Sequence, residues 1–310
     1  MNIHTDYRAL MTVSSPPPAR RTDRRCGSAL SSCGGLLRKT LIACCTLVSL
    51  NLINGTLNQV HADFIPSAMT GLVGWWDATD SSSMTLVGSS VQRWNSKVGD
   101  VYAAATQDSW RPSLVQDGNP ISGLDAVAFQ WDKLKIYDPT PSSMTAMTMF
   151  MAFDFNGGSY PLGFGSGASA GSALTYETRN GAVSIYGDSP NAVDVATGGG
   201  RDGTALLTGV SAFDAGWRTW AARGAGTVGT IQFWQNDVAA QMSYTQPATP
   251  LSIYGLAGNS GGIGGNYWGI NDGTIADIGE ILVFNRALSD SEVSQVNAYL
   301  ALIIVPAKTL

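Results

Sequence analysis

Two aromatic residues, Tyr267 and Trp268, interrupt a glycine-rich run, GLAGNSGGIGGNYWGINDG, that extends from Gly255 to Gly273. Because glycine allows open turns without steric cost, large rings placed among glycines either anchor the loop on the protein or face a ligand. An exposed aromatic face can stack on a sugar ring, while amide and carboxylate groups bond the sugar hydroxyls. The loop supplies such groups at Asn259, Asn266, Asn271 and Asp272. We therefore predict a ligand-binding loop, with an aromatic anchor as the open alternative.

The sequence offers little evidence for a pair of catalytic carboxylates, which most glycosidases use. After residue 62 the glutamates are Glu177, Glu280 and Glu292. Asp277 and Glu280 share the segment IADIGE, but on a regular strand this spacing points the two side chains to opposite faces. We expect a structural role for both. The sequence thus favours a protein without catalytic activity, and an unrecognised Asp-based catalytic site is the weaker alternative.

Two aspartates in the segment WWDATD, Asp77 and Asp80, could supply oxygen ligands to a metal ion. Carboxylates of this kind bind Ca²⁺ in extracellular β domains, and Ca²⁺ is the only cofactor that the sequence suggests. The alternative is an Asx turn, in which an aspartate bonds the backbone two residues further on. The pattern favours the turn.

The histidine and cysteine residues all lie in the first 62 positions, at His4, His61, Cys26, Cys33, Cys44 and Cys45. The rest of the chain therefore has no group for Ser-His-Asp or Cys-His catalysis, for a His/Cys zinc or haem site, or for a disulfide. Its stability must come from a hydrophobic core.

Residues 1–62 have the order of a secretory signal, with Arg38 and Lys39 before an apolar run and a small-residue cleavage pattern after it. The apolar run Thr40–Ile53 has fourteen residues, which is short for a membrane span. We predict a leader that is cleaved after Ala62, and a secreted protein with no stable membrane insertion after processing. A retained anchor or a buried helix is the alternative.

The charge of the chain after the leader argues against nucleic acid as a partner. Seven of the 18 Lys and Arg residues and two of the 23 Asp and Glu residues lie before residue 63, so the rest carries 11 positive and 21 negative side chains, a formal charge of −10. Phosphate binding needs clustered Lys and Arg. We expect no nucleic-acid partner.

Short alternating runs separated by turn residues fill the chain between Gly71 and Gly279, with no helix period. Met144–Phe155 is apolar on both alternating faces, which predicts a central strand covered on both sides. Asn180-Gly181 and Asn236-Asp237 each separate two alternating runs and predict hairpins. We predict one all-β domain over 63–310, a two-sheet jelly-roll sandwich. Four tryptophans in strand-like runs are expected in the core or at a sheet edge: Trp75, Trp76, Trp94 and Trp131.

The segment GEILVFNRALSDSEVSQVNAYL predicts a buried strand followed by a capped helix. Ser289 and Glu292 have the spacing of a capping box, in which each side chain bonds a backbone N–H at the helix start. Apolar residues then recur at spacings of three and four, at Val293, Val296, Leu300 and Ile303. We predict a short C-terminal helix near Asp290–Leu302 that covers the sandwich.

The ending ILVFNRALSDSEV resembles that of the concanavalin A-like, laminin-G-like jelly-roll superfamily, in the bacterial and phage branch whose domains end in a strand followed by NRALSD-x-E. The opening Leu72–Asp100 is similar to the family's first strands, and Gly123–Ile136 to its next strand pair. The resemblance covers nearly all of the chain after the leader. It implies the jelly roll but not the function, because this superfamily includes lectins, glycosidases, lyases, adhesins and virion proteins.

Two departures from the family bear on function. The E-x-D-x-E motif of its laminarinase-like glycosidases has no counterpart here, and Asn95 stands where the family has Asp before a Lys-Ser-Gly turn. The sequence favours a secreted, non-catalytic recognition or adhesion domain that binds carbohydrate or another cell-surface ligand. A structural component of an extracellular or virion assembly is the alternative, and a carbohydrate-active enzyme is weaker still.

Overall fold

The computed structural model describes residues 64–158, 162–164, 174–179, 182–187, 204–208, 216–244, 247–248, 251, 253–254, 256, 261–265 and 273–304. The predicted leader lies outside them. The strands are β1 (Leu72–Asp77), β2 (Met84–Val87), β3 (Ser90–Asn95), β4 (Tyr102–Ala104), β5 (Ser113–Val115), β6 (Ala126–Gln130), β7 (Leu134–Tyr137), β8 (Ser143–Met144), β9 (Ala146–Gly158), β10 (Leu162–Phe164), β11 (Leu174–Arg179), β12 (Ala182–Gly187), β13 (Thr204–Thr208), β14 (Trp217–Ala225), β15 (Thr227–Gln235), β16 (Val238–Ala239), β17 (Gln241–Tyr244), β18 (Ile253–Tyr254), β19 (Gly262–Ile263) and β20 (Thr274–Phe284). The helices are η1 (Pro66–Ala68), η2 (Ser81–Ser83), η3 (Asp108–Trp110) and α2 (Asp290–Ile304).

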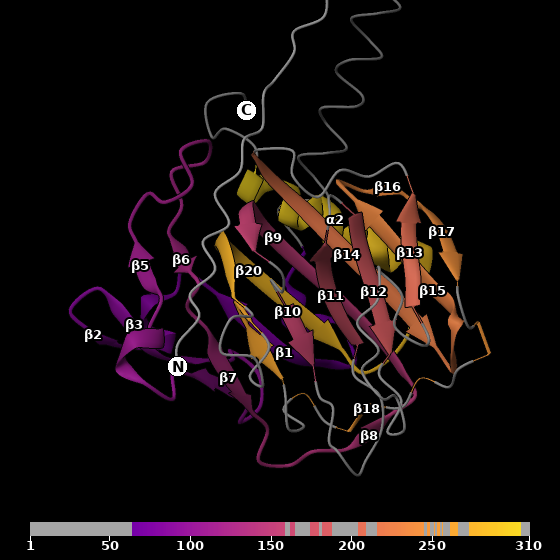
Figure 1. Cartoon of the computed structure of the whole chain (residues 1–310), viewed down its shortest axis with the longest axis horizontal. Helices are drawn as coiled ribbons and strands as arrows, with labels where there is room; N and C mark the ends of the chain where they lie inside the picture. The colour runs from indigo at the N-terminus through magenta and orange to yellow at the C-terminus, as the bar shows by residue number, and fades with distance from the viewer. Residues whose placement is uncertain are drawn as a thin grey trace, which may run out of the picture. The chain divides into compact units, whose positions relative to one another are not determined.

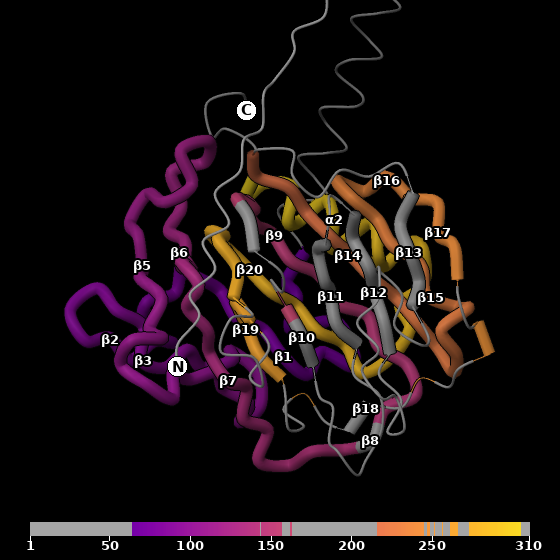
Figure 2. The backbone as a smooth tube through the Cα atoms, in the orientation of Figure 1, coloured from indigo at the N-terminus to yellow at the C-terminus, as the bar shows by residue number. Residues whose placement is uncertain are grey.

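The strands form two antiparallel layers. In one layer the order is β16, β15, β14, β9 and β20, and β20 then pairs with both β6 and β1. In the other the order is β17, β13, β12, β11, β10, β19, β7, β4, β3 and β2. Figure 1 shows β10 to β13 in front of β20, β9 and β14, and Figure 2 shows β19 near its partner β7. The predicted all-β, two-sheet sandwich is confirmed.

The central strand β9 is buried on both faces, as its sequence predicted. Its alternating Met147, Met149, Met151 and Phe153 point into the core between the two layers. Phe150 and Ala152 point the other way, into a second core beneath α2. Because β14 and β20 flank it, β9 has no free edge along the paired length.

Helix α2 covers the outer face of the β9 layer. The predicted stripe of Val293, Val296, Leu300 and Ile303 is buried against Phe150, Trp217, Leu282 and Phe284. Burying four such aliphatic side chains contributes about 1.5–3 kcal/mol each before chain entropy is counted. The short C-terminal helix is therefore confirmed. Among the described residues, no helix has the length and apolar character needed to cross a bilayer.

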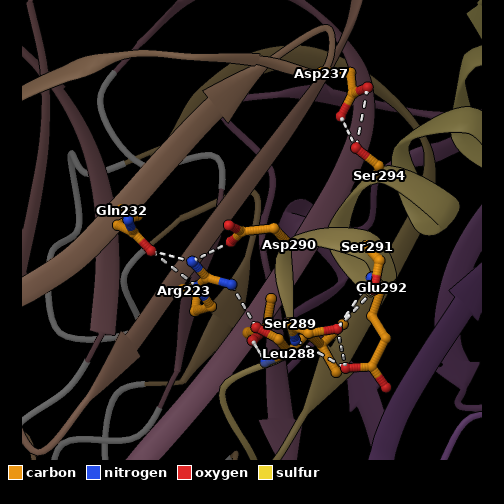
Figure 3. Close-up of polar contacts among 10 residues, drawn as sticks. Arg223, Gln232, Asp237, Leu288, Ser289, Asp290, Ser291, Glu292 and Ser294 are labelled. Carbon is orange, nitrogen blue, oxygen red and sulfur yellow. Dashed lines mark hydrogen bonds and ion pairs between the residues drawn. The ribbon is translucent and has the colours of Figure 1, made fainter.

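The helix start has the predicted capping box (Figure 3). The Ser289 backbone N–H donates to Glu292 Oε2 at 2.8 Å, and the Glu292 N–H donates to Ser289 Oγ at 3.3 Å. Arg223 of β14 ties this end of the helix to the sheet, since its guanidinium donates to the Leu288 carbonyl at 2.5 Å and to Asp290 at 2.7 Å. The capping box and this arginine together fix where α2 begins.

Both predicted hairpins are present. Strand β11 pairs with β12 through Arg179 and Ala182, on either side of Asn180-Gly181. Strand β15 pairs with β16 through Gln235 and Val238. The residues of this second turn have φ angles of 51° and 62°, the left-handed values that a two-residue turn of this type requires.

We expect Ser289→Ala to lower the free energy of unfolding by about 1 kcal/mol, because the Glu292 N–H loses its capping oxygen. Ser291→Ala leaves both backbone bonds of the capping box in place and is the matched control. Urea titrations followed by circular dichroism measure the two changes. Equal losses in the two variants would contradict the assigned cap.

Candidate ligand-binding site

The six residues predicted to contact a ligand lie outside the described residues: Asn259, Asn266, Tyr267, Trp268, Asn271 and Asp272. The structure does describe the framework that carries their loop. Strand β19 is hydrogen-bonded to β7 on one side and β10 on the other. Beyond it, Gly265 and Gly273 form a β-bridge that closes the segment between them. The segment with Tyr267 and Trp268 thus starts and ends at one point of the sandwich.

This framework requires glycine at two positions, because a side chain would have no space at either of them. A Cβ at Gly264, whose φ is 79°, would collide with the Phe129 ring. A Cβ at Gly273 would lie 2.7 Å from the Trp131 Cα atom. The turn after β6 therefore packs directly against the base of the predicted loop.

Trp131 differs from its predicted environment. Trp75, Trp76 and Trp94 are buried as expected, but Trp131 is 54% exposed and stands in the turn between β6 and β7, not inside a strand. Its φ is 69°, in the left-handed region that a bulky residue rarely adopts. Its placement in the core or at a sheet edge was therefore wrong. The signal was in the sequence, since Asp132, a common turn residue, follows Trp131 between two alternating runs.

A pocket of about 200 Å³ lies at the opposite end of β7 from Trp131. Its apolar wall comes from Leu72, Val73, Val101, Met144 and Leu256. Its polar lining comes from Asp100, Asp138, Thr140 and Ser142. Since Leu256 belongs to the glycine-rich run, the predicted loop borders this pocket at its beginning.

The polar lining has two kinds of group. Asp138 stabilises the fold, because its carboxylate accepts hydrogen bonds from the Leu256 N–H at 2.9 Å and the Thr140 N–H at 3.2 Å. Asp100, Thr140 and Ser142 are exposed at the rim. A carboxylate and two hydroxyls beside an apolar wall suit a small ligand with hydroxyl groups and a C–H face.

The possible metal ligands Asp77 and Asp80 have other partners. Asp77 accepts the Thr79 N–H at 2.9 Å, which is the Asx turn, and its second oxygen lies 2.8 Å from the Lys97 ammonium. Asp80 lies 3.7 Å from the same ammonium, and a hydrogen bond from Ser82 lowers the pKa of Asp80. The Lys97 ammonium already pairs with both carboxylates, so a metal cation would have to take its place. Among the described residues, no group of three or more His, Cys, Asp or Glu side chains is arranged to hold a metal.

Asp77 also faces the most deeply buried carboxylate of the described chain, Glu280, across the β1–β20 pair. Glu280 is 2% exposed and accepts hydrogen bonds from Trp75 Nε1 at 2.6 Å and from the Tyr299 hydroxyl at 2.9 Å. Burial, and then the Asp77 charge, raises the pKa of Glu280 to about 8. These bonds join the sheet to α2.

The expectation that Asp277 and Glu280 face opposite ways was wrong. The β20–β9 register shifts at Gly279, so Asp277 pairs with Asp154 while Glu280 pairs with Ala152. Residues 152 and 154 share a face of β9, so their partners share it too. Burial and Asp154 raise the pKa of Asp277. A glycine inside a strand is a known signal for such a bulge.

A shared face does not make this pair an active site. The Glu280 carboxylate is covered by Trp75 and by Tyr299 of α2, so a substrate has no access to it in this structure. The expected structural role for Glu280 agrees with this geometry. The bulge at Gly279 is what turns its side chain toward this buried position.

Comparison with known proteins gives only distant similarity. No protein-family model and no curated protein matches the sequence. Among solved structures, the binding domain of Paraclostridial Mosquitocidal Protein 1 has a TM-score of 0.47 and 11% identity, over 73% of this chain and 52% of that one. The receptor binding domain of botulinum neurotoxin D has a TM-score of 0.46 and 9% identity, with coverage of 73% and 52%.

A third structure is domain 4 of an extracellular arabinanase from Geobacillus stearothermophilus, in complex with arabinotriose. Its TM-score is 0.41 at 12% identity, over 73% of this chain and 98% of that domain. This chain spans about half the length of the first two structures.

Glu280→Gln is expected to remove a pH dependence of stability. The folded-state pKa of about 8 lies above the usual 4.5, so the unfolded chain ionises first and the wild type loses stability as pH rises from 4.5 to 8. The loss is on the order of 4 kcal/mol. Gln keeps an oxygen for Trp75 and Tyr299 but does not ionise. Urea midpoints across this pH range measure the effect, and parallel curves for the two proteins would contradict it.

Proposed function

We propose that the chain is a secreted, non-catalytic recognition domain of the laminin-G-like jelly-roll type, which binds carbohydrate or another cell-surface ligand. The observation that carries the proposal is the pocket of about 200 Å³ whose wall includes Leu256, at the start of the predicted loop. Its rim offers acceptors and donors at Asp100, Thr140 and Ser142. Leader cleavage after Ala62 would bring this domain outside the cell without a membrane anchor.

The chemistry of the pocket supports a neutral, hydroxyl-rich ligand. Its apolar wall can contact the C–H face of a sugar ring while the rim oxygens bond hydroxyl groups. The pocket is smaller than those that enclose drug-sized ligands, so it suits one sugar unit. The predicted loop residues, with Tyr267 and Trp268 as stacking rings, would extend this contact. Nucleic acid is disfavoured by the acidic charge, and a Ca²⁺ ion at Asp77 and Asp80 would have to displace Lys97.

A structural role in an extracellular or virion assembly is the second candidate. The observation in its favour is strand β2, where Leu86 and Val87 are exposed apolar side chains on an edge of the described sheet. Such edges support lateral packing between copies. A carbohydrate-active enzyme is weaker, because the one glutamate with a strongly raised pKa in the described chain is buried under α2.

Ser142→Trp is expected to block the pocket and abolish retention on the polysaccharide that the wild type binds. The site is exposed, so the free energy of unfolding should change by less than about 0.5 kcal/mol. Ser81→Trp, at another exposed serine outside the pocket lining, is the matched control. Affinity electrophoresis in gels that contain laminarin, xylan, arabinan or hydroxyethyl cellulose provides the measurement. Equal retention of both variants would remove the pocket from the proposal.

Trp268→Ala separates a ligand contact from a loop anchor. As a stacking contact, Trp268 can be lost with almost no change in the melting curve, while retention in the same gels is abolished. As an anchor, its loss would leave a cavity and cost about 3–5 kcal/mol. Trp94→Ala, at a buried core tryptophan, is the reference for that larger loss. We expect the first outcome, and a strongly destabilised variant would refute it.

A further inference from the structure

The turn between β6 and β7 presents a tryptophan in a conformation that favours glycine. Trp131 has a φ of 69° and is 54% exposed. Left-handed backbone is costly for a residue with a bulky side chain, and more than half of the Trp131 surface stays exposed. A residue that strains the fold while exposing a large aromatic ring is better explained by a contact outside the fold.

The backbone at this turn is held on several sides. The Trp131 N–H donates to the Thr274 carbonyl at 2.9 Å, and the Cα atom faces Gly273 with no space for another side chain. The Gln130 N–H donates to Asp132 Oδ2 at 3.1 Å. These contacts fix the left-handed conformation whatever the side chain is. Glycine would adopt it without strain, so the fold alone does not require tryptophan at this position.

We propose that Trp131 is a stacking residue for a neutral sugar ring, at a second contact point of the carbohydrate site proposed above. The inference rests on that proposed function and adds a residue and a place to it. The backbone of Trp131 lies against Gly273 of the Gly265–Gly273 bridge, so this turn is next to the point where the segment with Tyr267 and Trp268 begins and ends. The pocket lies at the other end of β7, and the two contacts can be tested separately.

The neighbouring groups suit sugar hydroxyls. Gln130 is exposed beside the ring in sequence and offers both a donor and an acceptor. Asp132 is partly buried, and that burial raises its pKa. Lys133 is buried, and its ammonium lies 4.2 Å from the centre of the Trp110 ring. The turn therefore presents a flat ring with polar neighbours but no exposed cation, which favours a neutral ligand over an anionic one.

The test uses the full chain as the expression host releases it, with Trp131→Ala, Trp131→Phe and Trp131→Gly. Retention in gels with laminarin, xylan, arabinan or hydroxyethyl cellulose should weaken at least tenfold for the Ala and Gly variants, and less for the Phe variant, which keeps a ring. Val238→Ala, which truncates a more exposed apolar side chain on β16, should retain wild-type affinity. Trp131→Gly should also raise the melting temperature, because glycine relieves the strain. A structural tryptophan would give the opposite shift.

The outcomes separate the two proposals. Suppose that a polysaccharide gel retains the wild type and Trp131→Ala equally but does not retain Ser142→Trp. The stacking role of Trp131 is then overturned, and the proposed function stands. If no polysaccharide retains the wild type, both are overturned. Sedimentation with phosphatidylcholine vesicles that is lost in Trp131→Ala would show that the ring contacts a lipid surface, and it would overturn the sugar assignment.

Discussion

Strand β20 is the element on which the rest of the structure depends. It pairs with β9 along one edge and with β6 and β1 along the other, and nearly all of its side chains are buried. Its first residues lie beside Trp131, and its end leads directly into α2. The bulge at Gly279 turns Glu280 toward the helix, where Trp75 and Tyr299 bond it. One strand thus connects the candidate ligand-binding end to the second core.

Much of the fold could be predicted because its signals are local. The two apolar faces of Met147–Phe153 indicated a central strand, and Asn236-Asp237 indicated a tight turn. Ser289 and Glu292 satisfy each other's backbone N–H groups within one helical turn, so three residues of spacing were enough to predict the cap. Patterns of this kind depend only on residues close together in the sequence, so they can be recognised without knowing the distant contacts.

The features that the sequence analysis missed depend on distant contacts. A bulge at Gly279 requires the register of β9, which no spacing within β20 reveals. The backbone of Trp131 contacts Gly273 and bonds Thr274, residues more than a hundred positions away in the sequence. The pocket assembles from four separate segments around Leu72, Gly99, Asp138 and Leu256. The structure therefore adds the framework of the predicted loop, a nearby pocket and the exposed Trp131, while the six loop residues stay a prediction.

The most direct test is an NMR titration of the indole N–H signals with a soluble oligosaccharide derived from a polysaccharide that the protein retains. Ligand bound at the glycine-rich loop and its base should shift the signals of Trp131 and Trp268. The signals of Trp76 and Trp94, which are fully buried between the layers, should stay in place. Shifts confined to Trp75, beside Glu280 under α2, would place the site on the opposite side of the β9 layer and contradict the account.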